Sequence, residues 1–206
     1  MSTRTLAVVS AGLSNPSSTR LLADRLTAAA QAALTGRGIT ATVEVVELRK
    51  HARDLADNLL TGFPNESLRG AVDTVVGADG LIAVTPVFSA SYSGLFKTFF
   101  DVLDKDSLTG KPVLLGATAG TARHSLVLEH AMRPLFSYLR ATVAPTAVFA
   151  ASEDWAGGDS GTPALTGRVR RAAEELADLV AGRPPAAPAD PFADPTTSFE
   201  DLLKGL

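Results

Sequence analysis

A segment rich in hydroxyl groups follows the first apolar run of the chain. Residues 10–20 read SAGLSNPSSTR, with Ser17, Ser18 and Thr19 where a helix is expected to begin. The start of a helix has unpaired backbone N–H groups and a partial positive charge, so it stabilises an anion. The three hydroxyls can donate to other oxygens of a phosphate, and Arg20 adds a charge. This pattern favours a phosphate-binding loop, whereas plain N-capping needs only one such residue.

A second segment of small residues follows a later apolar run. Residues 85–97 read TPVFSASYSGLFK. Pro86 bends the chain, and the small residues 89–93 would let the backbone approach a planar ligand closely. Peptide N–H groups could then bond its ring atoms, while Phe88 and Tyr92 offer apolar edges. The alternative is an ordinary strand–helix junction rich in turn formers.

A third segment, residues 117–121, reads ATAGT and is also small, polar and uncharged. It could approach the same planar ligand from the other side. An ordinary turn would explain any one of the three segments. Their shared composition favours a common ligand site over three unrelated turns.

The pattern of apolar residues predicts alternating strands and helices around these segments. Strands are expected at 6–9, 41–48, 81–84, 113–117 and 143–150, and helices at 22–33, 65–76, 94–103, 125–139 and 165–180. Parallel strands need helical crossovers, which are right-handed, so a doubly wound three-layer α/β sandwich with a five-stranded parallel sheet is expected. Such folds bind ligands at the carboxyl ends of their strands, where the three segments would meet.

Composition excludes several other classes of protein. The 206 residues are 46% apolar, which suits one compact domain. A net charge of -3 argues against nucleic-acid binding, and the absence of cysteine excludes disulfides and thiolate metal sites. The apolar run 80–96 contains Pro86 and hydroxyls, so it is a poor membrane span. The initial run Leu6–Val9 is too short for a signal-peptide core, and we expect a cytoplasmic protein.

The titratable residues show no metal or acid–base pattern. His124 and His130, six residues apart, would lie on different faces of a helix, and Glu129 completes no metal-binding motif with them. His51 and Arg53 are expected at the surface. We therefore predict no metal site and name no catalytic side chain.

Together the segments SNPSSTR, TPVFSASYSGLFK and ATAGT resemble the NADPH-dependent FMN reductase family, in its actinobacterial branch. The resemblance covers roughly residues 4–180. Residues 86–97 resemble the family pattern P-x-Y-x-x-S-x-S/P-G-x-L-K, with Phe88 in place of the commoner tyrosine. The first loop keeps only Ser10 of the usual G-S-x-R opening. The family implies a flavodoxin-like fold with strand order 2-1-3-4-5.

The resemblance also implies roles for individual residues. Ser10, Ser17, Ser18 and Thr19 would hold the FMN phosphate. The isoalloxazine ring would be lined by Pro86, Val87, Phe88 and Ser91, with Thr118, Ala119 and Gly120 on its other edge. Apart from the resemblance, the position of Arg123 and His124 just after the third segment would let them meet a phosphate of NADPH or NADH.

The implied activity is an NAD(P)H-dependent FMN reductase. Hydride would pass directly from the nicotinamide to the flavin, so the protein supplies position and electrostatics. The family also implies a homodimer or homotetramer, and a flavin-dependent monooxygenase as a partner that receives reduced flavin. Alternatives are an FMN-dependent quinone or azo-compound reductase and a flavodoxin-like electron carrier. The small net charge favours an enzyme, because a carrier usually shows a strongly acidic docking face.

The last residues differ in composition from the domain expected at 1–182. Residues 183–195 read RPPAAPADPFADP, which predicts an extended linker. Within the remaining segment, Phe199, Leu202, Leu203 and Leu206 share one face of a short helix. We expect this helix either to dock on the protein body or a second subunit, or to be a frayed terminus.

Overall fold

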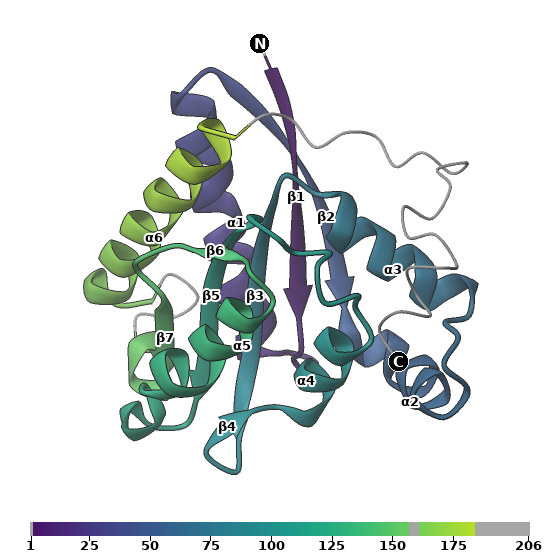
Figure 1. Ribbon diagram of the computed structural model, residues 1–206. Helices are drawn as coiled ribbons and strands as arrows, with labels where there is room; N and C mark the ends of the chain where they lie inside the picture. The colour runs from purple at the N-terminus through teal and green to yellow at the C-terminus, as the bar shows by residue number, and fades with distance from the viewer. Residues whose placement is uncertain (1, 157–160, 184–206) are drawn as a thin grey trace.

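The computed structural model describes residues 2–156 and 161–183. The linker and short helix predicted at the C-terminal end lie outside the described residues, apart from Arg183. Within the described part, a parallel sheet lies between two layers of helices (Figure 1). The three-layer sandwich predicted from the sequence is therefore confirmed.

The sheet has the strand order β2-β1-β3-β5-β6. Its strands are β1 (Ser2–Ser10), β2 (Ile39–Glu47), β3 (Gly80–Phe88), β4 (Ser91–Tyr92), β5 (Pro112–Ala119), β6 (Thr142–Val143) and β7 (Val148–Ala151). All pairings are parallel except that of β4, which forms an antiparallel hairpin with β3. The flavodoxin-like order 2-1-3-4-5 is confirmed in its arrangement, while the number of strands is larger than predicted.

The predicted fifth strand is divided into β6 and β7, which both pair with β5. Pro145 lies between them and has no N–H group to donate. The backbone N–H of Thr146 donates to the Glu175 carboxylate at 2.6 Å. The break therefore has a physical cause that the continuous apolar pattern did not reveal.

The helices differ from prediction in two places. The α-helices are α1 (Ser18–Gly36), α2 (Ala52–Thr61), α3 (Glu66–Gly77), α4 (Gly94–Asp101), α5 (Arg133–Tyr138) and α6 (Pro163–Ala181). The single helix predicted at 125–139 is a π-helix at Leu128–Met132 followed by α5, with Pro134 in the first turn of α5. Helix α2 was not predicted. His51, which precedes α2, is half-buried near Ser67, whereas Arg53 is exposed as expected.

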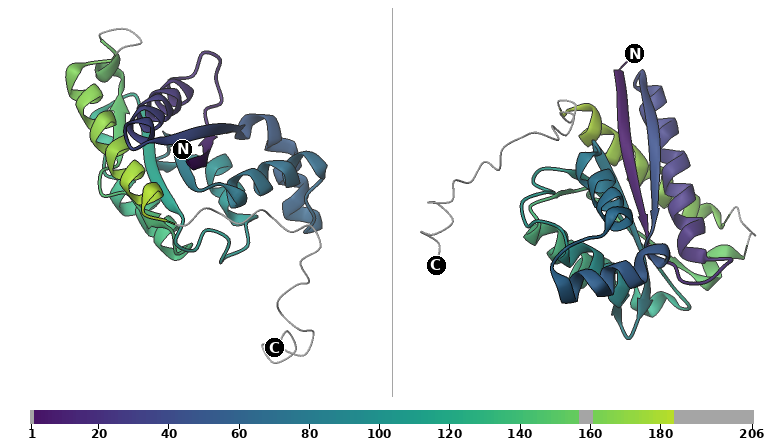
Figure 2. Two further views of the ribbon diagram at one scale, coloured as in Figure 1. Left: turned by 90° about the horizontal axis from the view of Figure 1, so that it is seen from above. Right: turned by 90° about the vertical axis from the view of Figure 1, so that its right-hand side faces the viewer.

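Alternate residues of the strands face two separate cores. Leu6 and Val8 of β1 pack with α1 and α6, whereas Ala7 and Val9 face the side covered by α2, α3, α4 and α5. Figure 2 shows α1, in purple, on one side of β1 and β2. Both faces are apolar because a parallel sheet is covered by helices on both sides. Among the helices of the described part, none is long and apolar enough to cross a membrane.

Candidate functional site

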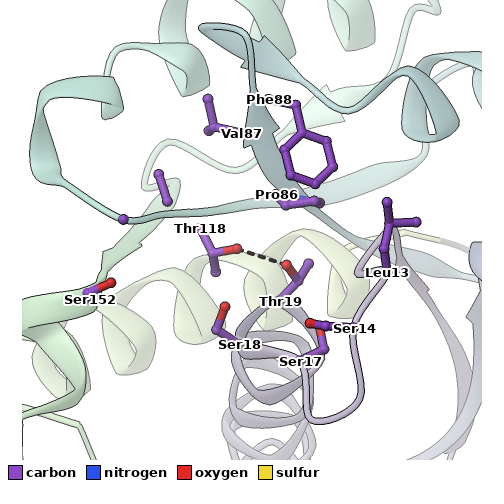
Figure 3. A pocket seen from close by; sticks show the side chains of 12 residues that line it. Leu13, Ser14, Ser17, Ser18, Thr19, Pro86, Val87, Phe88, Thr118 and Ser152 are labelled. Atoms are coloured by element: carbon purple, nitrogen blue, oxygen red, sulfur yellow. Dashed lines mark hydrogen bonds between the residues drawn. The ribbon is translucent and has the colours of Figure 1, made fainter.

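A pocket of about 390 Å³ lies at the carboxyl edge of the sheet, where the three predicted segments meet (Figure 3). It is lined by Leu13, Ser14, Ser17, Ser18, Thr19, Pro86, Val87, Phe88, Thr118, Ala119, Gly120 and Ser152. Its volume is within the range of small-molecule sites in proteins. The pocket brings together residues from the start of α1 and the ends of β3 and β5.

The hydroxyl side of the pocket is formed at the start of α1. The Ser17 Oγ atom caps the helix by accepting from the backbone N–H of Arg20 at 3.3 Å. The first N–H groups of the helix have no partner within it. Gly12 lies against this cap, because a Cβ atom at Gly12 would be only 2.1 Å from Ser17 Oγ. Because Gly12 has no side chain, the Ser17 hydroxyl can occupy its position in the pocket wall.

A buried hydrogen bond joins the first segment to the third. The Thr19 and Thr118 Oγ1 atoms are 2.8 Å apart, and both residues are buried. One hydroxyl must donate to the other, so the accepting hydroxyl keeps its own hydrogen for another acceptor. This bond fixes the end of β5 against α1 and leaves one donor available to a ligand.

The end of β3 forms the apolar side of the pocket. Pro86, Val87 and Phe88 line it, and the Phe88 side chain is 49% exposed. The chain then turns through Ser89 and Ala90, whose φ angles of 48° and 69° are positive, and returns as β4. This hairpin carries residues 89–93 away from the pocket lining. Those residues therefore do not form the wall that was predicted for them.

The start of α4 is held by hydrogen bonds to the end of β3. The Thr85 Oγ1 atom accepts from the backbone N–H of Ser93 at 3.0 Å. Ser93 Oγ in turn caps α4 by accepting from the backbone N–H of Phe96 at 3.2 Å. Both residues are buried. A Cβ atom at Gly94 would meet no protein atom within 4 Å, so no neighbouring protein group requires a glycine at this position.

The pocket includes nine of the eleven residues predicted to bind the cofactor. Three come from each segment: Ser17, Ser18 and Thr19, then Pro86, Val87 and Phe88, then Thr118, Ala119 and Gly120. Ser10 is buried at the end of β1, and Ser91 lies on β4, so neither belongs to the lining. Leu13, Ser14 and Ser152 were missed. Ser152 directly follows β7, and the rule that ligands bind at carboxyl ends of strands could have identified it.

The charged residues predicted near the site lie outside the lining. The Arg20 guanidinium pairs with Asp24 at 2.7 Å and with Glu47 at 3.3 Å, so the charge that we expected for a phosphate is already partnered. Arg123 is exposed and His124 is half-buried in a short 3₁₀-helix after β5. Among the described residues, no charged side chain lines the pocket, and no group of three potential metal ligands occurs.

The chain matches the family model described as NADPH-dependent FMN reductase over residues 4–156. It is 37% identical over 178 residues to the FMN reductase (NADPH) of Pseudomonas aeruginosa, covering 86% of this chain and 93% of that protein. It is 37% identical over 174 residues to the NADH-dependent FMN reductase SfnE of Pseudomonas putida, covering 84% of this chain and 91% of that protein.

Solved structures show the same similarity. An oxidoreductase from Corynebacterium diphtheriae is 49% identical with a TM-score of 0.84, covering 89% of this chain and 100% of that chain. The apo form of the NADH:FMN oxidoreductase EmoB is 25% identical with a TM-score of 0.76, covering 89% of this chain and 93% of that chain. These matches confirm the family resemblance found in the three segments. The chain belongs to the NADPH-dependent FMN reductase family.

Proposed function

We propose that the pocket at the carboxyl edge of the sheet holds FMN, and that the protein reduces this flavin with NADPH or NADH. The family gives the class of reaction, in which a nicotinamide cofactor reduces FMN. The observation that carries the assignment to this pocket is the group of hydroxyls at the start of α1, opposite an apolar wall at the end of β3 (Figure 3).

The hydroxyl side fits a phosphate group. Ser17 uses its oxygen to accept from the helix backbone, so its O–H hydrogen remains to donate. Ser18 is exposed at the first position of α1, and the Thr19–Thr118 pair keeps one further donor. A phosphate at this helix start would also receive backbone N–H groups and the positive end of the helix dipole.

The opposite side fits a flat ring. Pro86, Val87 and Phe88 present apolar surface, while Ala119 and Gly120 have side chains too small to block a planar group. Phe88 lacks the hydroxyl of the tyrosine more common in the family, so it contributes apolar contact and no hydrogen bond. These residues would orient the ring and exclude water from one of its sides.

Bound FMN would supply a ring that accepts a hydride from nicotinamide. The chain contributes binding and orientation, since a fixed geometry of two reactants removes much of the entropic barrier. Arg123 and His124 come three and four residues after Gly120, with Arg123 exposed and His124 half-buried. We assign to them contact with the phosphate groups of the nicotinamide cofactor.

Steady-state oxidation of NADPH and NADH tests the proposed function. We expect either cofactor to be oxidised when FMN is present, with little oxidation when flavin is omitted. Riboflavin should support the reaction less well because it lacks the phosphate. An oxidation rate that is independent of added FMN, in protein shown to contain no flavin, would contradict the proposal.

An accessible pocket supports release of the reduced flavin to a separate flavin-dependent monooxygenase. Leu13 is 53% exposed and Phe88 is 49% exposed, so two walls of the pocket border solvent. Rapid dissociation of reduced FMN in stopped-flow measurements would agree with this role. Flavin that stays bound through many turnovers would instead indicate a direct acceptor such as a quinone.

Self-association is supported by three exposed apolar side chains at the end of α2. Leu59, Leu60 and Phe63 are 59%, 87% and 78% exposed. Exposed apolar side chains that gather in one place commonly mark a protein contact. Light scattering should give the mass of a homodimer or homotetramer, and Leu60→Asp should shift the protein toward monomer. The cytoplasmic location stays a prediction.

A further inference from the structure

The loop before α1 forms part of the pocket wall but has few hydrogen bonds of its own. The backbone N–H of Ala11 donates to the Val84 carbonyl at 3.0 Å, and Ser17 caps α1. Between them, Leu13 and Ser14 line the pocket although both are exposed. Exposed loops with few contacts have low local stability. The position of this wall therefore depends on whatever holds the middle of the loop.

Arg49, two residues after the end of β2, contacts this loop. Its Nη1 atom donates to the Ser14 carbonyl oxygen at 3.2 Å, and its Nη2 atom lies 3.1 Å from the Glu47 carboxylate. One guanidinium thus joins the loop to the last residue of β2, an edge strand of the sheet. Arginine suits this position, because its planar group presents several donors in a fixed geometry.

Glu47 anchors Arg49 within a group of three cations. Besides Arg49, Arg20 lies 3.3 Å from its carboxylate and Lys50 lies 2.9 Å from it. The hydrogen bond from Lys50, together with the charges of Lys50, Arg49 and Arg20, lowers the pKa of Glu47 even though burial opposes this change. The carboxylate therefore stays ionised at neutral pH.

We propose that Arg49 is a positioning residue that holds the Leu13–Ser14 wall of the FMN pocket, with Glu47 as its anchor. This inference rests on the proposed function. Arg49 does not line the pocket, and its action passes through the Ser14 backbone. Holding the loop in place keeps the wall formed before FMN arrives, so less ordering is required on binding.

Lys50 provides a matched control for Arg49. Both side chains pair with Glu47, and either Arg49→Gln or Lys50→Gln removes one positive charge at the same place. Of these two side chains, only Arg49 makes a hydrogen bond to the loop in the described part of the structure. A general electrostatic attraction for FMN would therefore be weakened about equally by both substitutions, whereas loss of positioning would follow from Arg49→Gln alone.

Glu47→Gln distinguishes general electrostatic attraction from positioning of the loop, because the two explanations predict opposite changes in FMN affinity. The substitution removes a negative charge near the proposed phosphate position, so long-range electrostatics alone would tighten FMN binding. Loss of the anchor would release Arg49 and weaken binding. A weaker affinity in this variant therefore supports positioning, and a tighter affinity contradicts it.

The experiment is a fluorescence titration of the full chain and the three variants with FMN and with riboflavin, alongside thermal melts. We expect Arg49→Gln and Glu47→Gln to raise the Kd for FMN by about three- to tenfold, the range for one hydrogen bond. Lys50→Gln should change the Kd by less than about twofold, as for an exposed ion pair. The selectivity for FMN over riboflavin should fall in the first two variants at unchanged melting temperature.

The outcomes separate this inference from the proposed function. Wild-type protein that binds FMN no more tightly than riboflavin would contradict the placement of the phosphate. Wild-type protein that prefers FMN, with equal Kd values for Arg49→Gln and Lys50→Gln, would overturn the role of Arg49 alone.

Discussion

The two edges of the sheet hold their polar groups in different ways. At the carboxyl edge, short hydroxyl side chains and unpaired helix N–H groups surround an open pocket, and none of the described residues in its lining is charged. At the amino edge, long charged side chains are buried and bonded to groups within the protein, although the buried Nε atom of Arg4 has no hydrogen-bond partner among the described residues. The first edge keeps donors available for a ligand, whereas the second uses its donors to join elements to one another.

The amino edge is organised around Arg4 and Lys111. Arg4 lies 3.3 Å from the Asp79 carboxylate, and it also donates to the Arg183 carbonyl oxygen. Lys111 Nζ donates to the Val76 carbonyl at 3.1 Å and to the carbonyl of Ala78, at the end of α3. Burial lowers the pKa of Lys111 to about 8. These buried cations therefore hold the C-terminal ends of helices against the sheet.

The contrast between the two edges shows that burial and charge alone do not identify a functional site. The pKa of Lys111 is strongly lowered, yet this residue lies at the edge opposite the pocket. Its neighbours are backbone carbonyls that it satisfies. We therefore expect substitutions at the amino edge to change stability, and those at the carboxyl edge to change flavin binding.

The largest effect is expected at the amino edge. Arg4→Met would leave Asp79 partly buried without this cation, and breaking a buried pair from one side typically costs about 3 kcal/mol or more. Urea unfolding should show this loss in the free energy of unfolding. At temperatures where the variant is folded, its Kd for FMN should equal that of the wild type. A large change in FMN affinity would mean that the two edges are coupled.

Adding a methyl group at Gly12 should mainly weaken FMN binding at the carboxyl edge. Gly12→Ala would place a Cβ atom 2.1 Å from Ser17 Oγ and 3.1 Å from Thr19 Cβ, so the Ser17 hydroxyl must move. We expect the Kd for FMN to rise about tenfold or more, which corresponds to about 1.4 kcal/mol. Isothermal titration calorimetry measures this change. Gly70→Ala, on α3 where an added Cβ meets nothing within 4 Å, is the control.

The Thr19–Thr118 hydrogen bond should contribute a smaller coupling. Each single change to valine leaves a buried hydroxyl without its partner, whereas the double change removes both groups. A double-mutant cycle on the free energy of unfolding should therefore give a coupling of about 1 kcal/mol. Additive single effects would show that this bond does not join the two segments energetically.

The pH dependence of stability should reveal the contribution of the buried Lys111 side chain. Its pKa of about 8 in the folded state is lower than its ordinary value of 10.5, so the unfolded chain binds more protons in this window. The contribution of Lys111 to the free energy of unfolding should therefore increase as the pH rises from 8 toward 10.5, by at most about 1 kcal/mol per pH unit. Lys111→Met should remove this contribution, and an identical pH profile in both proteins would disprove it.

The sequence predicted the central strands because continuous apolar runs are typical of strands covered on both faces. Helix α2 was missed because its apolar residues do not mark one buried face. Leu55 is buried, whereas Leu59 and Leu60 are exposed. The β3–β4 hairpin was missed because its turn residues, Ser89 and Ala90, are not those that usually adopt positive φ.

Composition pointed to residues that line the pocket, whereas charge pointed to Arg20, Arg123 and His124, which lie outside the lining. The hydroxyls of Ser17, Ser18 and Thr19 meet at the pocket because they are local to one helix start. The pairing of Arg20 with Glu47 could not be read from the first segment, since Glu47 lies at the end of β2, 27 positions further along the chain. Arg49 was missed for the same reason, because its contact with Ser14 joins residues 35 positions apart.

The selectivity for FMN over riboflavin in Ser17→Ala tests the central claim most directly. Asn65→Ala is the matched control, because Asn65 caps α3 as Ser17 caps α1 but lies outside the pocket lining. We predict that Ser17→Ala raises the Kd for FMN about tenfold, the loss of one hydrogen bond to a charged group, and leaves the Kd for riboflavin nearly unchanged. Asn65→Ala should change neither value. Equal weakening of FMN and riboflavin by Ser17→Ala would contradict a phosphate site at the start of α1.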